Sequence, residues 1–314
     1  MKRRAFLLVT ACPFFVGAMH TLGATDSVHV LEQDWYDSAR GRTVPVRMYQ
    51  PIDAKGLLPV LLFSHGLGGS RAGGEQWARL WAANGYLCVH MQHHGSDEAL
   101  WKDKNPLAGF AALRRAMTLE NGVLRAGDVG FVLDEIARRK AAGTAPLAQA
   151  DLARIGLSGH SFGARTTVTT VSSVGDKRIR AAIAFSPAPE ANEALNRLRF
   201  GKISIPFMNL TGTADHLPLV DDFPAEARRL PYQFMPGPHQ YLLVLAGADH
   251  FVFNGQPAER KWNDQNRNVH APLIERATLA FWNAHLKGDA TALADLTGGG
   301  FQAAVGANGE WFSK

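Results

Sequence analysis

Residues 154–168 read RIGLSGHSFGARTTV, and the expected organisation of the chain starts from them. A short β-type run leads into GHSFG, residues 159–163, and a helix-compatible run follows. This is the G-x-S-x-G pattern in a strand–turn–helix context, where a tight turn exposes a serine for nucleophilic attack. The strained turn leaves little room beside the serine, which explains Gly159 and Gly163. The pattern predicts Ser161 as a nucleophile; the alternative is a serine that caps a helix start.

Strand and helix patterns alternate along the chain. Residues 28–37 and 43–50 predict an antiparallel hairpin at a sheet edge. Apolar runs predict buried strands at 58–63, 86–91, 152–157, 181–185, 205–210 and 241–246. Helical patterns lie at 75–83, 108–117, 123–140, 162–174 and 271–286. The alternation predicts an α/β fold, with a mostly parallel central sheet and helices on both faces. Residues 289–314 show no assignable pattern.

Two further residues follow strands in the order that a serine hydrolase of this architecture requires. Functional residues of an open parallel sheet collect in the loops at the carboxyl ends of its strands. Asp215 comes just beyond the run at 205–210, and His250 just beyond the run at 241–246. With Ser161 they give the order Ser, Asp, His. We expect Ser161 to attack an ester carbonyl, His250 to carry the proton, and Asp215 to orient the imidazole.

Other carboxylates are alternatives for the acid. Glu190, which follows the run at 181–185, is the main alternative to Asp215. Asp249 adjoins His250 and would need a contorted loop to orient it. Asp221 and Asp222 lie farther from the end of their strand.

Other histidines are weaker candidates for the base. His239 and His270 are expected to be surface or capping residues. His90, His93 and His94 form a histidine cluster, but no carboxylate or cysteine ligand pattern accompanies it. We therefore expect no metal at this cluster.

Ester cleavage also needs two N–H donors for the developing oxyanion. The backbone of Phe162, the residue after the nucleophile, is one expected donor. The backbone of Leu67 is the other, because it lies in the HGLGG stretch at 65–69 that follows the strand pattern at 58–63. A phosphate-binding role for that stretch lacks support, since the pattern G-x-x-x-x-G-K-[ST] is missing.

The first 24 residues are typical of an export signal. A basic start, KRR at 2–4, precedes an apolar run at 5–18 and small residues through Ala24. The double arginine also resembles a twin-arginine signal. We expect cleavage after Ala24, with Ala18 as the alternative. Residues 25–314 are then a single catalytic domain, periplasmic or secreted.

The two cysteines bear on anchoring and redox state. Cys12 lies in a stretch that resembles a lipoprotein processing box, so a lipid anchor is an alternative to free release. The apolar run around it is too short, and too clearly broken by Pro13, to predict a membrane span. Cys88 lies in a buried strand pattern and would be the only cysteine of the mature chain, which excludes an internal disulfide.

Composition limits the class of partner. Of 314 residues, 46% are hydrophobic and 19% charged, as in a globular protein with a large core. Without the three basic residues of the signal, 30 basic residues face 28 acidic ones. This near-balance predicts no nucleic-acid partner. A small-molecule or lipid ester is the expected ligand, and the sequence gives no oligomeric state.

Three stretches together resemble one family. FSHGLGGSR at 63–71, QHHGSD at 92–97 and GLSGHSFGA at 156–164 are similar to α/β-hydrolases grouped with platelet-activating-factor acetylhydrolases and predicted dienelactone hydrolases. The similarity runs from about residue 28 to residue 286. It implies an α/β-hydrolase fold and a serine carboxylic-ester hydrolase without metal or organic cofactor. It also implies that Ser161 is the nucleophile, that His250 is the base, and that Leu67 and Phe162 are the oxyanion donors.

The sequence departs from that family at the acid. In the acetylhydrolases the acid follows the strand after the elbow helix, but residues 185–189 contain no acid. Asp215 fits the commoner α/β-hydrolase arrangement, which bacterial polyester hydrolases share. True dienelactone hydrolases use a cysteine, so Ser161 argues against their substrate. We expect hydrolysis of short to medium acyl esters; the alternatives are a lipase, a polyesterase, a phospholipid deacylase, a peptidase or a non-catalytic binding protein.

Overall fold

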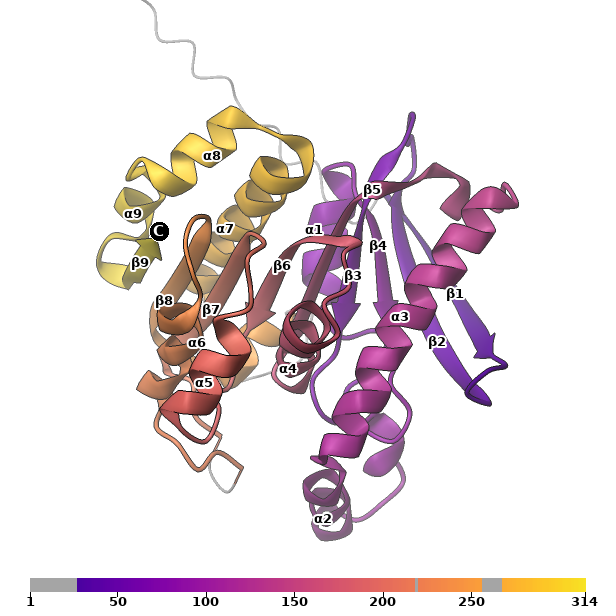
Figure 1. The fold of residues 1–314 in the computed structure, drawn as a ribbon, viewed down its shortest axis with the longest axis horizontal. Helices are drawn as coiled ribbons and strands as arrows, with labels where there is room; N and C mark the ends of the chain where they lie inside the picture. Colours follow the sequence, from indigo (N-terminus) through magenta and orange to yellow (C-terminus); the bar gives the residue numbers. More distant parts are fainter. Residues whose placement is uncertain (1–26, 218–219, 256–266) are drawn as a thin grey trace, which may run out of the picture.

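The computed structural model describes residues 27–217, 220–255 and 267–314, so the expected export signal lies outside the described residues. The described residues form a nine-stranded sheet with the order β1-β2-β4-β3-β5-β6-β7-β8-β9 (Figure 1). The strands are β1 (Val28–Asp37), β2 (Arg42–Pro51), β3 (Leu58–Ser64), β4 (Leu87–Met91), β5 (Ala150–His160), β6 (Ile179–Phe185), β7 (Phe207–Ala214), β8 (Gln240–Asp249) and β9 (Gly309–Ser313).

The strand directions confirm a mostly parallel sheet. Strands β3 to β8 pair in parallel throughout. The expected edge hairpin is present, because β1 and β2 pair antiparallel with Val28 opposite Pro51. At the other edge β9 runs antiparallel to β8. Connections between parallel strands must cross over the sheet, and the helices provide these crossovers.

Helices cover both faces of the sheet, as expected. The bounds are α1 (Glu75–Ala83), α2 (Pro106–Ala116), α3 (Leu119–Ala141), α4 (Phe162–Thr169), α5 (Glu193–Phe200), α6 (Leu230–Phe234), α7 (Arg267–Lys287), α8 (Ala290–Thr297) and α9 (Gly300–Val305). Alternate residues of β3 pack on opposite faces, because side chains of a strand alternate in direction. Leu61 joins the core with Trp81 of α1 and Trp282 of α7. Leu62 joins the core with Val132 of α3.

The structure adds elements that the sequence pattern did not indicate. The run at 162–174 ends as an α-helix at Thr169 and continues as the π-helical turn η3 (Thr170–Val174). The unassigned tail forms α8, α9 and β9, and Trp311 stacks on Tyr241 of β8. Within the described ranges, no helix has the length and apolar character needed to cross a membrane.

The fold brings three of the candidate residues to one edge of the sheet. Ser161 follows β5, Asp215 follows β7, and His250 follows β8. These strands are parallel, so their carboxyl ends meet at the same edge. In Figure 1 the loop after β7 and helix α2 both lie toward the lower end of the view.

Candidate active site

Ser161 occupies a strained turn between β5 and α4. Its backbone has φ 56° and ψ −115°, a conformation that L-residues rarely adopt. The Ser161 N–H donates to the Phe185 carbonyl oxygen at 2.9 Å, which ties the turn to the end of β6. A Cβ at Gly159 would overlap the backbone of Gly163, and a Cβ at Gly163 would overlap the Ser64 carbonyl oxygen. Both glycines are therefore required by close backbone approach.

His250 and Asp215 are in direct contact. Nδ1 of His250 lies 2.7 Å from Oδ1 of Asp215, and both residues are buried. His250 opens the 3-10 turn η5 (His250–Asn254). The Thr211 hydroxyl of β7 donates to the second carboxylate oxygen of Asp215 at 2.8 Å. With both carboxylate oxygens bonded, the carboxylate can hold one imidazole orientation.

Arg228 is a second, buried partner of Asp215. Its Nε lies 3.0 Å from Oδ1 and donates to the Asp215 carbonyl oxygen at 2.8 Å. Burial alone would raise the pKa of Asp215, but the hydrogen bond from His250 and the positive charges of His250 and Arg228 outweigh it. The pKa of Asp215 is therefore below its ordinary value. Arg228 lies in η4 (Ala225–Arg229), where the sequence carries no motif that would have indicated this role.

His160, next to the serine, holds the backbone of His250. Its Nε2 donates to the His250 carbonyl oxygen at 2.9 Å, and the two ring centroids are 4.7 Å apart. Burial, followed by the charge of His250, lowers the pKa of His160 to about 3, so the ring is neutral. Among the described residues, no hydrogen bond joins the Ser161 hydroxyl to His250. Such contacts commonly tighten only when substrate binds.

The two expected oxyanion donors are free to bind a ligand. Gly68 N–H donates to the Ser96 carbonyl oxygen at 2.9 Å, and Gly69 N–H donates to Gly66 at 3.1 Å. Just before these two glycines, the Leu67 N–H has no acceptor in the part of the chain that the structure describes. The Phe162 N–H is at the first position of α4, where a helix leaves its donors unpaired.

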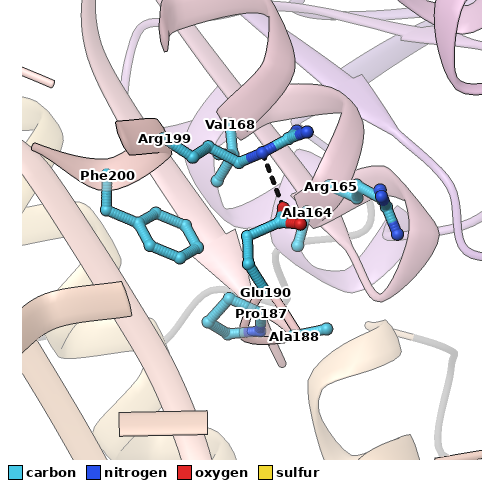
Figure 2. A pocket seen from close by; sticks show the side chains of 8 residues that line it. All are labelled: Ala164, Arg165, Val168, Pro187, Ala188, Glu190, Arg199 and Phe200. Atoms are coloured by element: carbon cyan, nitrogen blue, oxygen red, sulfur yellow. Dashed lines mark ion pairs between the residues drawn. The ribbon is translucent and has the colours of Figure 1, made fainter. Parts of the chain in front are cut away.

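The alternative carboxylates have other partners. Glu190 lines a small cavity with Arg199, and their Oε1 and Nε atoms are 2.6 Å apart, so its carboxylate is paired with this arginine (Figure 2). The Asp249 side chain accepts from the Phe251 and Val252 N–H groups and caps η5.

The remaining candidate side chains also have other partners or surroundings. Asp221 pairs with Arg228 at 2.6 Å. The expectation that His270 is a surface residue is wrong. It is buried, with Nε2 3.0 Å from the Ala246 carbonyl oxygen, because the start of α7 packs over the end of β8. His239 is partly buried just before β8, as a residue at the start of a strand can be.

His93 belongs to a second, entirely buried Ser-His-Asp arrangement. Its Nε2 is 2.9 Å from Ser64 Oγ, and its Nδ1 is 2.9 Å from Asp128 Oδ2. All three side chains are fully buried, so no substrate can reach Ser64. Burial lowers the pKa of His93 well below its ordinary value. Within the described ranges, no group of three or more metal-ligating side chains is assembled.

A comparison with known protein families finds a similarity for one part of the chain. Residues 12–104 match the model of the family described as platelet-activating factor acetylhydrolase, isoform II. The match covers strands β1 to β4 and the loop with Leu67, and it ends before Ser161. No curated protein matches the sequence. The protein has the α/β-hydrolase fold. Within this fold, the matched part carries one expected oxyanion donor, and the unmatched part carries the serine, the acid and the histidine.

Proposed function

We propose that this α/β-hydrolase is a serine esterase that cleaves short to medium acyl esters. The contact between His250 and Asp215, beside a strained serine turn, is the observation that carries the proposal. The Leu67 and Phe162 N–H groups, which have no acceptor among the described residues, add the means of stabilising an oxyanion. The similarity of residues 12–104 to acetylhydrolases supports ester hydrolysis in particular, because an acetylhydrolase cleaves acetyl groups.

The reaction would proceed in two steps. Ser161 Oγ bonds to the ester carbonyl carbon while His250 Nε2 takes the hydroxyl proton, and the carbonyl oxygen becomes an oxyanion bound by Leu67 and Phe162 N–H. Collapse of this intermediate breaks the carbon–oxygen bond, and His250 returns the proton to the leaving alcohol. Water then attacks the acyl-enzyme in the same way, which releases the acid and restores Ser161. Throughout, Asp215 remains ionised and stabilises the charged imidazole.

Apolar side chains near the oxyanion loop support a substrate with an acyl chain. Trp101 donates through Nε1 to the Gly68 carbonyl oxygen at 2.7 Å. A Cβ at Gly68 would meet Leu113 of α2, so this helix lies against the loop. Leu107 and Phe110 of the same helix are 79% and 37% exposed. A lipase or phospholipid deacylase is the second candidate, because exposed apolar side chains on a helix that contacts the oxyanion loop favour substrates in a lipid phase.

Export is part of the proposal. The basic and apolar pattern of residues 1–24 supports translocation, with periplasmic or secreted protein as the product. Fractionation of cells that express the full chain tests this, and mass spectrometry of the exported form gives the cleavage site. Full-length protein that stays in the cytoplasm would contradict export. It would leave the proposed chemistry untouched.

Replacement of the serine tests the chemistry. Ser161→Ala should abolish hydrolysis of p-nitrophenyl acetate and butyrate and should also abolish labelling by a fluorophosphonate probe, with an unchanged circular dichroism spectrum. Ser173→Ala, at an exposed serine of η3, is the matched control and should retain both activities. Peptide mapping of the wild-type adduct should identify Ser161. Wild-type protein that neither hydrolyses these esters nor takes up the probe would support a non-catalytic binding protein.

A panel of substrates separates the candidate esterase classes. Esters of two to eight acyl carbons should be the best substrates, with emulsified triglycerides, phospholipids, polyester films and peptides below them. A preference for emulsified or bilayer substrates over soluble esters would favour the lipase or phospholipid deacylase. Cleavage of amides in preference to esters would indicate a peptidase.

A further inference from the structure

Arg125 of α3 is a buried guanidinium. It is only 1% exposed. Among the described residues no carboxylate lies within ion-pair distance of it, although a buried charge is costly unless it is well solvated by the protein. Burial lowers the pKa of Arg125 to about 9, partly opposed by the negative charges of Asp128 and Asp97.

Its donors instead bind neutral oxygens from three separate segments. Nε donates to the Thr166 hydroxyl of α4 at 2.8 Å, and Nη1 donates to the Ser96 hydroxyl in the loop after β4 at 2.9 Å. Nη2 donates to the Ser64 hydroxyl at the end of β3 at 3.0 Å and to the carbonyl oxygen of the next residue, His65. A guanidinium suits this task because its donors are fixed in one plane.

Two of these segments carry the expected oxyanion donors, and the third, with Ser96, binds the loop that contains Leu67. His65 is two residues before Leu67. The carbonyl of Ser96 holds the N–H of Gly68, the residue after Leu67, at 2.9 Å. On the other side, Cζ of Arg125 lies 4.7 Å from the centre of the Phe162 ring. One side chain therefore contacts the segment before Leu67, the residue that binds Gly68, and the ring of Phe162.

The loop needs such a support. Gly66, Gly68 and Gly69 provide little side-chain packing to hold it, and glycine permits many backbone conformations. Oxyanion stabilisation requires donors held within a few tenths of an ångström of the place where charge develops. Thr166 extends the support into α4, because its hydroxyl both accepts from Arg125 and donates to the Phe162 carbonyl oxygen at 3.0 Å.

We infer that Arg125 is a positioning residue that fixes the oxyanion donors Leu67 and Phe162 relative to each other. The inference rests on the proposed esterase function. It gives Arg125 no contact with substrate, so its effect appears in the stabilisation of the transition state and not in the binding of the ester. Loss of the guanidinium should lower kcat and leave KM nearly unchanged.

Two substitutions on α3 test the inference. Arg125→Lys keeps the charge but cannot reach all four acceptors, and kcat for p-nitrophenyl butyrate should fall about 10- to 100-fold, with KM within about threefold. Inhibition by a trifluoromethyl ketone, whose serine adduct carries an oxyanion, should weaken by the same factor. Arg139→Met is the control on the same helix. It removes a guanidinium that packs 4.9 Å from the Trp35 ring, so it should change stability and leave kcat at the wild-type value.

A milder pair covers the case in which Arg125 variants fail to fold. Thr166 and Thr167 both donate to the carbonyl four residues earlier, but only Thr166 contacts Arg125. Thr166→Val should lower kcat about 3- to 10-fold, by the loss of one of the four contacts, whereas Thr167→Val should not.

The outcomes separate this inference from the function on which it rests. Folded Arg125→Lys or Thr166→Val protein with wild-type kcat would overturn the inference alone. So would a loss of kcat without the parallel loss of trifluoromethyl ketone affinity, because that result indicates a general structural role. Wild-type protein without esterase activity or probe labelling would overturn the proposed function and the inference together.

Discussion

His250 Nδ1 lies 2.7 Å from Asp215 Oδ1, at the ends of two neighbouring parallel strands, β8 and β7. Glu190, one strand earlier, is instead bound to Arg199 at 2.6 Å. The acid that follows β7 is thus the one in contact with the histidine. This differs from the acetylhydrolase pattern, in which the acid follows the preceding strand.

The contact predicts which carboxylate matters for the rate. Asp215→Asn should reduce kcat for p-nitrophenyl butyrate by about 10⁴-fold, because an amide cannot hold the imidazole in the tautomer that accepts a proton. Glu190→Gln, the matched control, should keep wild-type kcat and lose only the ion pair with Arg199. The opposite ranking of these two variants would assign the acid to Glu190.

Arg228 should set the pH at which activity is lost on the acidic side of the pH profile. Its charge lies 3.0 Å from Asp215 and lowers the pKa of that carboxyl, so Arg228→Gln should raise it. Protonation then begins at a higher pH, and the acid limb of kcat/KM against pH should move upward. Arg229→Gln, which removes a surface pair with Glu310, is the control. An acid limb that coincides in all three proteins would contradict this role.

Close backbone packing at the serine turn should make Gly163 intolerant of a side chain. Gly163→Ala places a Cβ against the Ser64 carbonyl oxygen and should lower the free energy of unfolding by about 2–4 kcal/mol. Gly130→Ala, in α3 where the new Cβ would meet nothing within 4 Å beyond the backbone of its own helix, should instead stabilise by about 0.5–1 kcal/mol. Urea unfolding measures both. Equal effects of the two substitutions would mean that the approach at Gly163 is looser than it is in the structure.

Buried neutral histidines should make the fold sensitive to acid. Burial lowers the pKa of His90 to about 3, from an ordinary value of 6.5. The unfolded chain therefore binds a proton at His90 below about pH 6.5 while the folded chain does not, and stability falls as the pH drops from there toward 3. Between pH 8 and pH 5 this one residue should cost about 2 kcal/mol.

The variant His90→Phe keeps the stacking on Phe63 and removes the titrating group. It should lose about 2 kcal/mol less than the wild type over that pH interval, as measured by urea unfolding. His29→Phe, at an exposed position of β1, is the control and should follow the wild-type curve. A His90→Phe protein with the wild-type pH dependence would show that His90 is not neutral in the folded state.

Local sequence patterns were sufficient to predict most strands of the central sheet. Apolar runs and alternation gave the strands from β1 to β8 to within a few residues, because burial on one or both faces leaves a direct trace in sequence. The antiparallel edge strand β9 and the helices α5, α6, α8 and α9 were missed. All of them are short, and the exposure of Leu195 and Leu198 weakens the periodic pattern of α5.

The sequence by itself determined the serine turn, the order of Ser161, Asp215 and His250, and the glycine-rich loop with Leu67, because each is a short pattern adjacent to a strand. Only the tertiary structure decided which carboxylate contacts His250. It also decided that two arginines distant from these residues in sequence, Arg125 and Arg228, contact the residues that form the site. Contacts of this kind join residues on different helices and loops, and their partners are backbone carbonyls and hydroxyls that leave no distinctive pattern in sequence. The chemistry can be read along the chain, whereas the groups that hold it in place are brought together only by packing.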